Sequence, residues 1–155
     1  MSDATSLDSS PTDLNPPSMV AFTAMTNIAL LAGMALTPNT GAGGQVPGSF
    51  DKALTSASQT ARCCGLAVRS ALVDTVALCQ YSSLLPLTEA QWDAVLTDDA
   101  GAGLAPGSWY YASAATAGGL TRTAPVGGNY VTPVGLALSS KVMLILLQLP
   151  TATSS

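Results

Sequence analysis

The chain carries the same landmarks twice, in the same order. Each set has a leucine three residues before a glycine, and a later Gly-Leu-Ala that opens an apolar run. The two sets are Leu30, Gly33 and 65–67 in the first half, and Leu104, Gly107 and 135–137 in the second. Matching landmarks at nearly the same separation indicate an internal duplication. The chain is therefore predicted to contain two tandem, related β-meanders, at about 28–87 and 102–150.

The segments around these landmarks have the composition of a β protein. Turn signals such as TPNTGAGGQVPG, DDAGAG and APGS separate short runs rich in Val, Leu, Tyr and Thr, which is typical of short strands joined by tight turns. One segment differs, because Thr88 can cap a helix and Gln91 stands at the capping-box position. We expect a mainly β fold over 19–150, a small β-sandwich or barrel with one short helix near Trp92, followed by a C-terminal tail at 151–155.

Charged residues are scarce. Only 9% of the 155 residues are charged while 48% are hydrophobic, and the net charge is −4; an average soluble protein has about 25% charged residues. Such a chain has weak electrostatic protection against association, which favours a component of an assembly. Its five cationic residues are scattered along the sequence, whereas nucleic-acid binding needs a concentrated basic face. We expect no direct contact with DNA or RNA.

The residue types that carry most enzyme chemistry are missing or isolated. The chain has no histidine, and its three cysteines, Cys63, Cys64 and Cys79, lack the spacing of a zinc or redox centre. Adjacent side chains in a strand point to opposite faces, so Cys63 and Cys64 are interpreted as small packing residues. Asp98 and Asp99 are interpreted as a solvated turn, because no further ligands follow at calcium-loop spacing. We predict a binding protein with no catalytic residues, metal or cofactor.

One uncharged segment, Met19 to Leu36, approaches the length of a membrane-spanning helix. Polar residues dilute it, Gly33 suits a turn, and no Lys or Arg flanks it to set an orientation. The residues before it are acidic, whereas a signal peptide begins with a basic region. A small membrane or secreted surface protein is therefore kept as an alternative only, and we expect no membrane contact.

Two strand-like segments are apolar on both faces. In SWYYAS, alternation places Trp109 and Tyr111 on one face, interpreted as core-facing, and Tyr110 on the other, where its hydroxyl suits an interface. In KVMLILL, one face is expected to pack on the core and the other on a second sheet or a neighbouring subunit. Met143 and Ile145 are candidate subunit-facing residues, although the same strand can belong to the core. These surfaces predict self-association, as a homotrimer.

Residues 1–18 cannot form a core of their own. They hold three prolines and three aspartates with only isolated apolar side chains, a composition typical of an extended arm. Ordering such a segment costs conformational entropy that a partner has to offset. We expect the arm to clamp a neighbouring subunit, with Leu14 as an apolar anchor and Pro16 and Pro17 beside it.

The order of motifs in the second half resembles a module of tailed-bacteriophage virion proteins. The motifs are a tryptophan-containing linker, GL-x-PG before an aromatic YY strand, GGLT-x-x-AP, and a closing VG-x-ALS strand. The upstream segment from ALLAGMAL to CGLAVRSALVDTVALCQYSSLLPLT resembles the partner meander of the same proteins. The resemblance extends from Ala29 to about Leu149. Its motifs of glycine, proline, threonine and aliphatic residues specify a β scaffold well and a biological role poorly.

This resemblance implies a capsid decoration, or cement, protein. Such a protein binds the outside of the phage head, often as a trimer, and stabilises contacts between major capsid subunits. The implied partners are the major capsid protein and other copies of the chain, and the implied location is the outer capsid surface of a virion made in the host cytoplasm. Related modules occur in head and tail fibres, so a fibre module that binds a host-surface glycan is the alternative. The family offers no catalytic residues to carry over.

Overall fold

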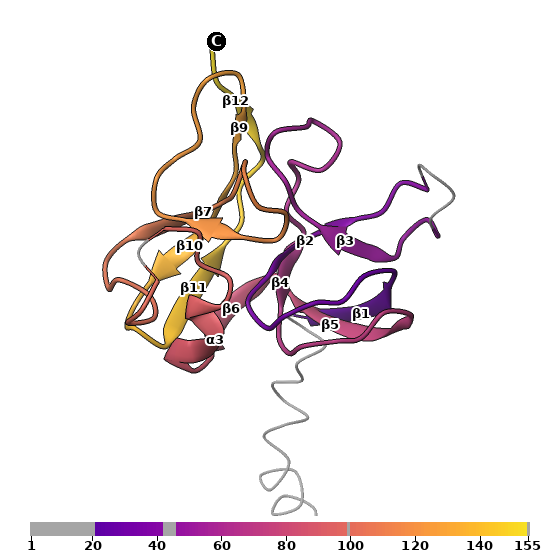
Figure 1. Cartoon of the computed structure of the whole chain (residues 1–155), viewed down its shortest axis with the longest axis horizontal. Helices are drawn as coiled ribbons and strands as arrows, with labels where there is room; N and C mark the ends of the chain where they lie inside the picture. The colour runs from indigo at the N-terminus through magenta and orange to yellow at the C-terminus, as the bar shows by residue number, and fades with distance from the viewer. Residues whose placement is uncertain (1–20, 42–45, 99, 155) are drawn as a thin grey trace, which may run out of the picture.

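The structure, a computed structural model, describes residues 21–41, 46–98 and 100–154. Two β-sheets lie side by side, one formed by the indigo to magenta half of the chain and the other mainly by the orange to yellow half (Figure 1). The described residues contain many strands and one short helix. The expectation of a mainly β fold is therefore confirmed.

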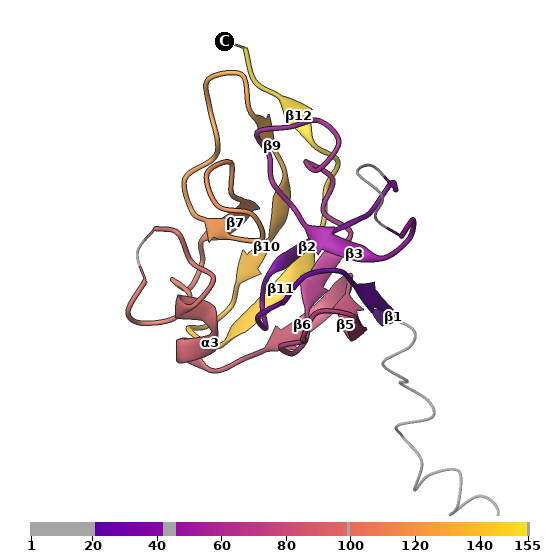
Figure 2. The same ribbon diagram turned by 45° about the vertical axis from the view of Figure 1, so that its right-hand side comes forward.

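The first sheet has five strands. In hydrogen-bonded order they are β1 (Ala21–Thr26), β3 (Phe50–Lys52), β2 (Ala35–Pro38), β4 (Gly65–Ala67) and β5 (Thr75–Gln80). The last strand, β5, pairs back onto β1. All neighbours are antiparallel except β1 and β3, which meet through the single parallel pair of Thr26 and Phe50. The sheet thus curls into a small barrel whose last seam is one residue pair wide (Figure 2).

The second sheet is open. Its strands, in hydrogen-bonded order, are β6 (Ser82–Pro86), β11 (Val142–Leu146), β10 (Pro133–Ala137), β7 (Trp109–Ala112) and β8 (Leu120–Thr121). A separate two-stranded ribbon pairs β9 (Tyr130–Val131) with β12 (Thr151–Ala152) and stands above both sheets (Figure 2). Residues 151–155, expected as a tail, therefore contain a short strand.

The two sheets share one strand order. From the first strand of each half, the order is β1-β5-β4-β2-β3 in the first sheet and β6-β11-β10-β7-β8 in the second. The registers match as well, because Leu36 lies opposite Gly65 as Tyr110 lies opposite Gly135. The duplication inferred from the sequence is thus present in the strand pairing.

Backbone hydrogen bonds at the landmark glycines also repeat. The N–H of Gly33 donates to the carbonyl of Ala67 at 2.7 Å, and the N–H of Gly107 donates to the carbonyl of Ala137 at 2.8 Å. Both glycines have positive φ angles, 86° and 80°, a conformation that costs glycine little and other residues more. Each half therefore turns into its second strand in the same way.

The halves divide at a different place from the expected one. Strand β6 lies within the predicted first half, 28–87, but it pairs with β11 in the second sheet. Strand β1 precedes that range and belongs to the first sheet. The duplicated units run from β1 to β5 and from β6 to β11, and the chain crosses between them at Tyr81. Long-range strand pairing, which a local pattern does not specify, decides this boundary.

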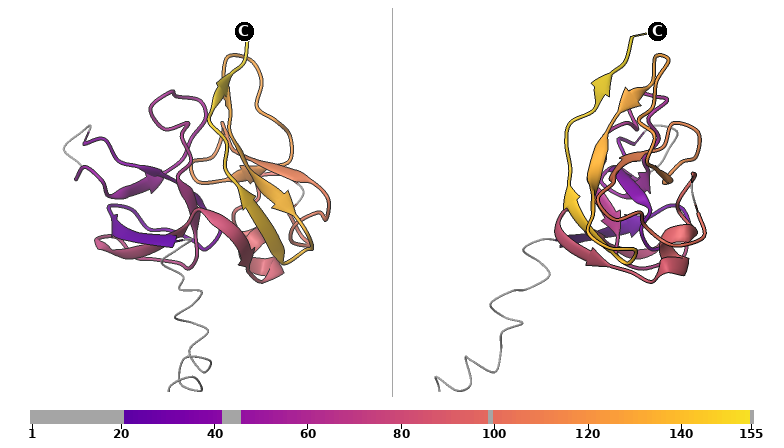
Figure 3. Two further views of the ribbon diagram at one scale, coloured as in Figure 1. Left: turned by 180° about the vertical axis from the view of Figure 1, so that it is seen from behind. Right: turned by 90° about the vertical axis from the view of Figure 1, so that its left-hand side faces the viewer.

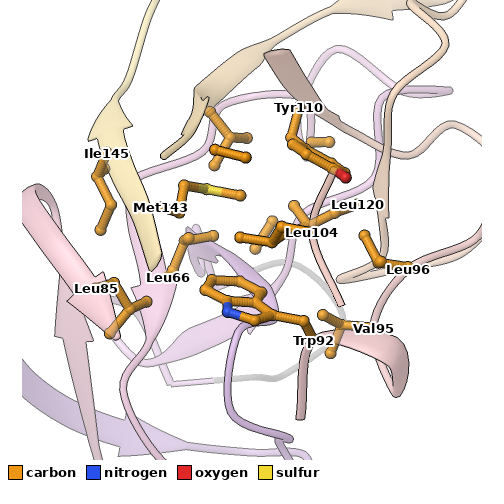
Figure 4. Packing of buried hydrophobic residues seen from close by; sticks show 14 of the residues in the cluster. Leu66, Leu85, Trp92, Val95, Leu96, Leu104, Tyr110, Leu120, Met143 and Ile145 are labelled. Atoms are coloured by element: carbon orange, nitrogen blue, oxygen red, sulfur yellow. The ribbon is translucent and has the colours of Figure 1, made fainter. Parts of the chain in front are cut away.

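Two hydrophobic clusters stabilise the fold. The smaller one fills the barrel and consists of Leu30, Leu36, Phe50, Ala67, Ala77 and Cys79. The larger one fills the second half and also includes Ala35, Ala53 and Leu66 from the first (Figure 4). Cys63 packs against the larger cluster and Cys64 against the smaller one. The two adjacent cysteines therefore point to opposite sides, as expected, and serve both cores.

Backbone hydrogen bonds join the two halves as well. The N–H of Ala35 donates to the carbonyl of Gly118 at 2.9 Å, and the N–H of Gly118 donates to the carbonyl of Ala53 at 2.7 Å. Another bond of 3.0 Å runs from the N–H of Thr55 to the carbonyl of Ser113. Because buried backbone groups are costly to leave unpaired, these bonds hold the halves in one relative position.

The helix α3 (Glu89–Asp93) begins with the predicted capping box. The Gln91 N–H donates to the Thr88 hydroxyl at 3.2 Å, and the Thr88 N–H donates to the Gln91 side chain at 2.9 Å. This helix places Trp92 in the larger cluster, fully buried, with its indole N–H donating to the carbonyl of Lys141 at 3.0 Å. The helix thus ties the linker to the turn before β11.

Candidate interaction surface

The most unusual surface of the described molecule is the outward side of the second sheet, called here the outer face. Figure 3, left, views the molecule from this side, with β10 and β11 in yellow. The outer face consists of Leu84, Pro86, Trp109, Tyr111, Pro133, Leu136, Val142, Leu144 and Leu146. None of the residues in strands β6, β7, β10 and β11 carries a charge at neutral pH. A continuous apolar area of this kind indicates an interaction site.

Four residues form a row across the outer face. Register places Leu84 opposite Leu144, Leu144 opposite Leu136, and Leu136 opposite Trp109. The two ends of the row are the most open, with Leu84 49% exposed and Trp109 37% exposed. Directly opposed side chains lie about 5 Å apart, so the row is one continuous apolar strip.

The equivalent row of the first sheet is covered. It runs from Ala21 through Gln80 and Leu66 to Ala35 in the same register. Leu66 and Ala35 have no exposed surface, and both belong to the larger cluster shared with the second half. The same face of the repeated unit is therefore buried within the chain in one copy and open in the other.

The alternation of β11 explains which side chains point outward. Met143 and Ile145 face the core and are 0% and 2% exposed, whereas Val142, Leu144 and Leu146 lie on the outer face. Both sets are apolar, so the hydrophobic pattern of the segment is compatible with either orientation. Met143 and Ile145 are core residues, which corrects their assignment as subunit-facing residues.

Strand β7 has the opposite orientation from the expected one. Tyr110 is 1% exposed, and its hydroxyl accepts a hydrogen bond from the N–H of Ala105 at 2.8 Å. Trp109 and Tyr111 stand on the outer face instead. Tyr110 is therefore not an interface residue, and the face predicted to point into the core is the accessible one. The remaining candidate interface residues, Leu14, Pro16 and Pro17, lie outside the described residues.

A small groove of about 160 Å³ lies on the outer face. It is lined by Trp109, Tyr111, Pro133 and Gln148. Two aromatic rings and a proline supply flat apolar walls, and the exposed amide of Gln148 supplies a hydrogen-bond donor and an acceptor. The groove is thus suited to an extended ligand with apolar rings and free carbonyl groups.

The edge of the sheet beside the outer face is blocked. The Gln80 amide donates to the carbonyls of Ser82 and Leu84 at 2.9 and 2.8 Å, so two outward groups of β6 are already bonded. Pro86 at the end of the same strand has no N–H to offer. Contacts through the sheet face are therefore favoured over the addition of another strand at this edge.

A second group of exposed apolar side chains lies on the first sheet. Met25 and Val76 stand opposite each other on β1 and β5, and Leu72 and Val73 form the turn that leads into β5. Asp74 lies in that turn and adopts a positive φ of 58°. This group has four apolar residues against nine on the outer face, and it includes a charged residue in its turn.

Asp98 has a structural role that the sequence pattern did not reveal. Its carboxylate accepts hydrogen bonds from the Thr121 hydroxyl at 2.7 Å and from the N–H groups of Arg122 and Thr123 at 3.0 and 3.2 Å. Partial burial alone would raise the pKa of Asp98, but these donors outweigh it and hold the pKa below its ordinary value. Asp98 therefore fixes the turn after β8, and Asp99 lies outside the described residues.

The described residues contain no group of three or more His, Cys, Asp or Glu side chains placed to hold a metal ion. Within the same residues, no helix is long and apolar enough to cross a membrane. Most of the segment considered as a membrane span instead forms β1, a turn and β2. Its first two residues, Met19 and Val20, lie outside the described part of the chain.

Burial and hydrogen bonds raise the pKa of two of the three thiols, those of Cys63 and Cys79, whereas a hydrogen bond with Cys79 lowers the pKa of Cys64. Burial is the main cause that raises the pKa of Cys63 from 9.0 to about 12, and the Cys63 thiol donates to the Gly65 carbonyl at 3.3 Å. A hydrogen bond with Cys64 and burial together raise the pKa of Cys79. Neutral, protonated thiols at these two positions fit packing and not nucleophilic chemistry.

This shift predicts an alkaline loss of stability. Above pH 9 the unfolded Cys63 thiol releases its proton while the folded one retains it up to about pH 12. The contribution of Cys63 to the free energy of unfolding is therefore fully present below pH 9. Between pH 9 and about pH 12 it falls by about 1.4 kcal/mol per pH unit. Urea denaturation at several pH values should show a shallower alkaline decline in Cys63→Ala than in the wild type. Equal slopes in the two proteins would contradict the buried, protonated thiol.

No protein-family model matches the chain, and no curated protein matches it in sequence.

Proposed function

We propose that the chain is a structural virion protein that binds the outside of a phage capsid and stabilises contacts between major capsid subunits. The outer face carries this proposal: four adjacent strands present apolar side chains without a charge. Burial of such a surface against another protein is favourable by about 25 cal/mol per Å² of apolar area. The outer face is the contact through which the chain joins the assembly on the particle, which includes other copies of the chain.

The remainder of the described molecule supports binding without catalysis. Its polar side chains anchor turns, as Asp98 does, or cap an edge, as Gln80 does. Two duplicated units share a core and backbone hydrogen bonds, which gives a rigid body able to present one fixed surface. The motif order that resembles phage virion proteins supplies the capsid as the partner, and self-association as a homotrimer belongs to the same proposal.

The glycan-binding fibre module is a second candidate, and one observation favours it. The groove at Trp109 and Tyr111 combines aromatic rings with the Gln148 amide, and rings of this kind can pack on the apolar face of a sugar. The number of sites that the chain occupies on the particle distinguishes the two functions. A decoration protein saturates many equivalent sites on a head, whereas a fibre occupies few.

Binding to phage heads assembled without the chain tests the proposal. The wild type should co-sediment with such heads to saturation. Leu144→Asp places a charge in the middle of the outer face, where burial against a partner leaves it uncompensated. We expect its affinity for heads to fall at least about tenfold, since such burial costs several kcal/mol.

Val126→Asp is the matched control, because Val126 is 72% exposed and lies in the loop between β8 and β9, which is not part of the outer face. It should bind heads as the wild type does, and both variants should keep the wild-type circular dichroism. Folded Leu144→Asp that saturates heads at the wild-type concentration would exclude the outer face as the contact. A wild type that fails to co-sediment with heads would overturn the proposed function.

A further inference from the structure

The groove at Trp109 lies at one end of an apolar strip that has no cover in the described molecule. The strip crosses four strands, from Leu84 on β6 to Trp109 on β7, a distance of about 14 Å at the usual strand spacing. The equivalent strip of the first sheet is buried inside the chain. A narrow, extended ligand would cover the exposed strip of the second sheet, as the core of the chain covers the equivalent strip of the first sheet.

The chemistry of the groove favours a proline-rich segment. Trp109, Tyr111 and Pro133 form its apolar walls, and the Gln148 amide can donate to a carbonyl. Proline-rich segments in polyproline II conformation bind such aromatic grooves, because they are already extended and expose their carbonyl groups. Little conformational entropy is then lost on binding.

The chain itself contains a segment of this kind among the residues that precede the described part. Residues 11–17 read PTDLNPP, with three prolines and one leucine in seven residues. In polyproline II conformation seven residues span about 22 Å, long enough to cross the strip of about 14 Å. No other stretch of seven residues in the sequence has three prolines.

The short tether favours docking of the proline pair in the groove of another copy over docking in the groove of its own chain. Pro17 precedes Ala21, the first residue of β1, by four residues, a reach of at most about 14 Å. The crossing from β6 to β7 alone takes three strand spacings, about 14 Å. Ala21 pairs with Gln80, just before β6, so a path from Ala21 across the outer face to Trp109 includes this crossing.

We therefore infer that the Pro11–Pro17 segment of a second copy of this chain docks across the outer face, with Pro16 and Pro17 in the groove at Trp109. This inference rests on the proposed function and deepens it, because it names a partner of the outer face. Prolines stack on the two aromatic rings, Gln148 donates to a carbonyl of the segment, and Leu14 packs on the leucine strip.

Two full-length variants test the docking. The arm variant combines Pro16→Ser with Pro17→Ser and keeps the groove, and the groove variant, Trp109→Ala, keeps the arm. In sedimentation velocity over a concentration series, each variant should self-associate about tenfold more weakly than the wild type, which corresponds to about 1.4 kcal/mol. Leu72→Ala, an exposed apolar residue of the first sheet, is the control and should associate as the wild type.

An equimolar mixture of the two variants tests whether the arm comes from a second copy. The mixture contains intact arms on one chain and intact grooves on the other, so mixed complexes should form at concentrations where neither variant associates alone. A fluorescent label on the arm variant reports them. In the wild type, Trp109 emission should shift to shorter wavelength as concentration rises, while buried Trp92 contributes a constant background.

Three results would overturn the inference. The first is a wild type that stays monomeric with unchanged Trp109 emission at all concentrations. The second is a mixture that behaves as the sum of its separate variants, which would place the arm on its own chain. The third is weaker association of the groove variant while the arm variant associates as the wild type does. This result would mean that a surface other than the arm of the second copy occupies the groove. Head binding that persists in these cases would leave the proposed function standing.

Discussion

Replacement of Trp92 by alanine is expected to lower the free energy of unfolding by about 3–5 kcal/mol. The indole is fully buried, and a Cβ on Gly33 of the first half would lie only 3.1 Å from its ring. Its removal leaves a cavity between the duplicated units and deletes the hydrogen bond to the Lys141 carbonyl. For a chain of this length the melting temperature should fall by about 6–20 °C, measured by circular dichroism.

Trp109→Ala is the matched control for this prediction, because the same atoms are removed from a residue that is 37% exposed. It should cost less than Trp92→Ala, because removal of a partly exposed side chain leaves no closed cavity. Trp92→Phe keeps most of the ring volume and should fall between the two. Equal losses in Trp92→Ala and Trp109→Ala would contradict the central place of Trp92 in the core.

The duplication could be predicted from the sequence because it rests on glycines that nothing else replaces easily. A positive φ, as at Gly33 and Gly107, and a close backbone approach, as at Gly65 and Gly135, leave a mark in the sequence at the position itself. The capping box at Thr88 is local in the same sense, since both its bonds join residues three apart. Features of this kind need no knowledge of distant partners.

The orientation of the strands could not be predicted in this way. Alternation places Trp109 and Tyr110 on opposite faces, and likewise Leu144 and Met143. Because both members of each pair are apolar, the pattern does not indicate which face points into the core. The structure places Tyr110 and Met143 inside. Tyr110 can be buried because its hydroxyl finds the N–H of Ala105, a partner five residues away that alternation does not reveal.

The outer face was missed for a related reason. Its residues come from β6, β11, β10 and β7, which are distant in sequence and become one surface only through their pairing. The sequence indicated that the chain has more apolar strand faces than one core can cover, so that some apolar face would remain exposed. Which residues remain uncovered depends on the packing of the first unit against the second, through contacts such as those of Leu66 and Ala35.

Alanine at Gly65 or at Gly135 is expected to destabilise the chain by about 3 kcal/mol at each site, the upper end of the usual cost of overpacking. A Cβ on Gly65 would lie 2.5 Å from the Gln80 carbonyl oxygen, and one on Gly135 would lie 2.5 Å from the Leu144 carbonyl oxygen. Both obstacles are backbone atoms of the neighbouring strand, which cannot move without disturbing the pairing of β4 with β5 or of β10 with β11.

Gly127→Ala isolates this collision from the ordinary cost of replacing a glycine. Gly127 has a positive φ of 69°, but a Cβ there would meet nothing within 4 Å, so the backbone strain of about 1–2 kcal/mol is the whole expected cost. Urea denaturation of the three variants should give similar losses at Gly65 and Gly135, both larger than at Gly127. A loss at one landmark glycine and none at the other would show that the two units, although paired alike, are not constrained alike by their sheets.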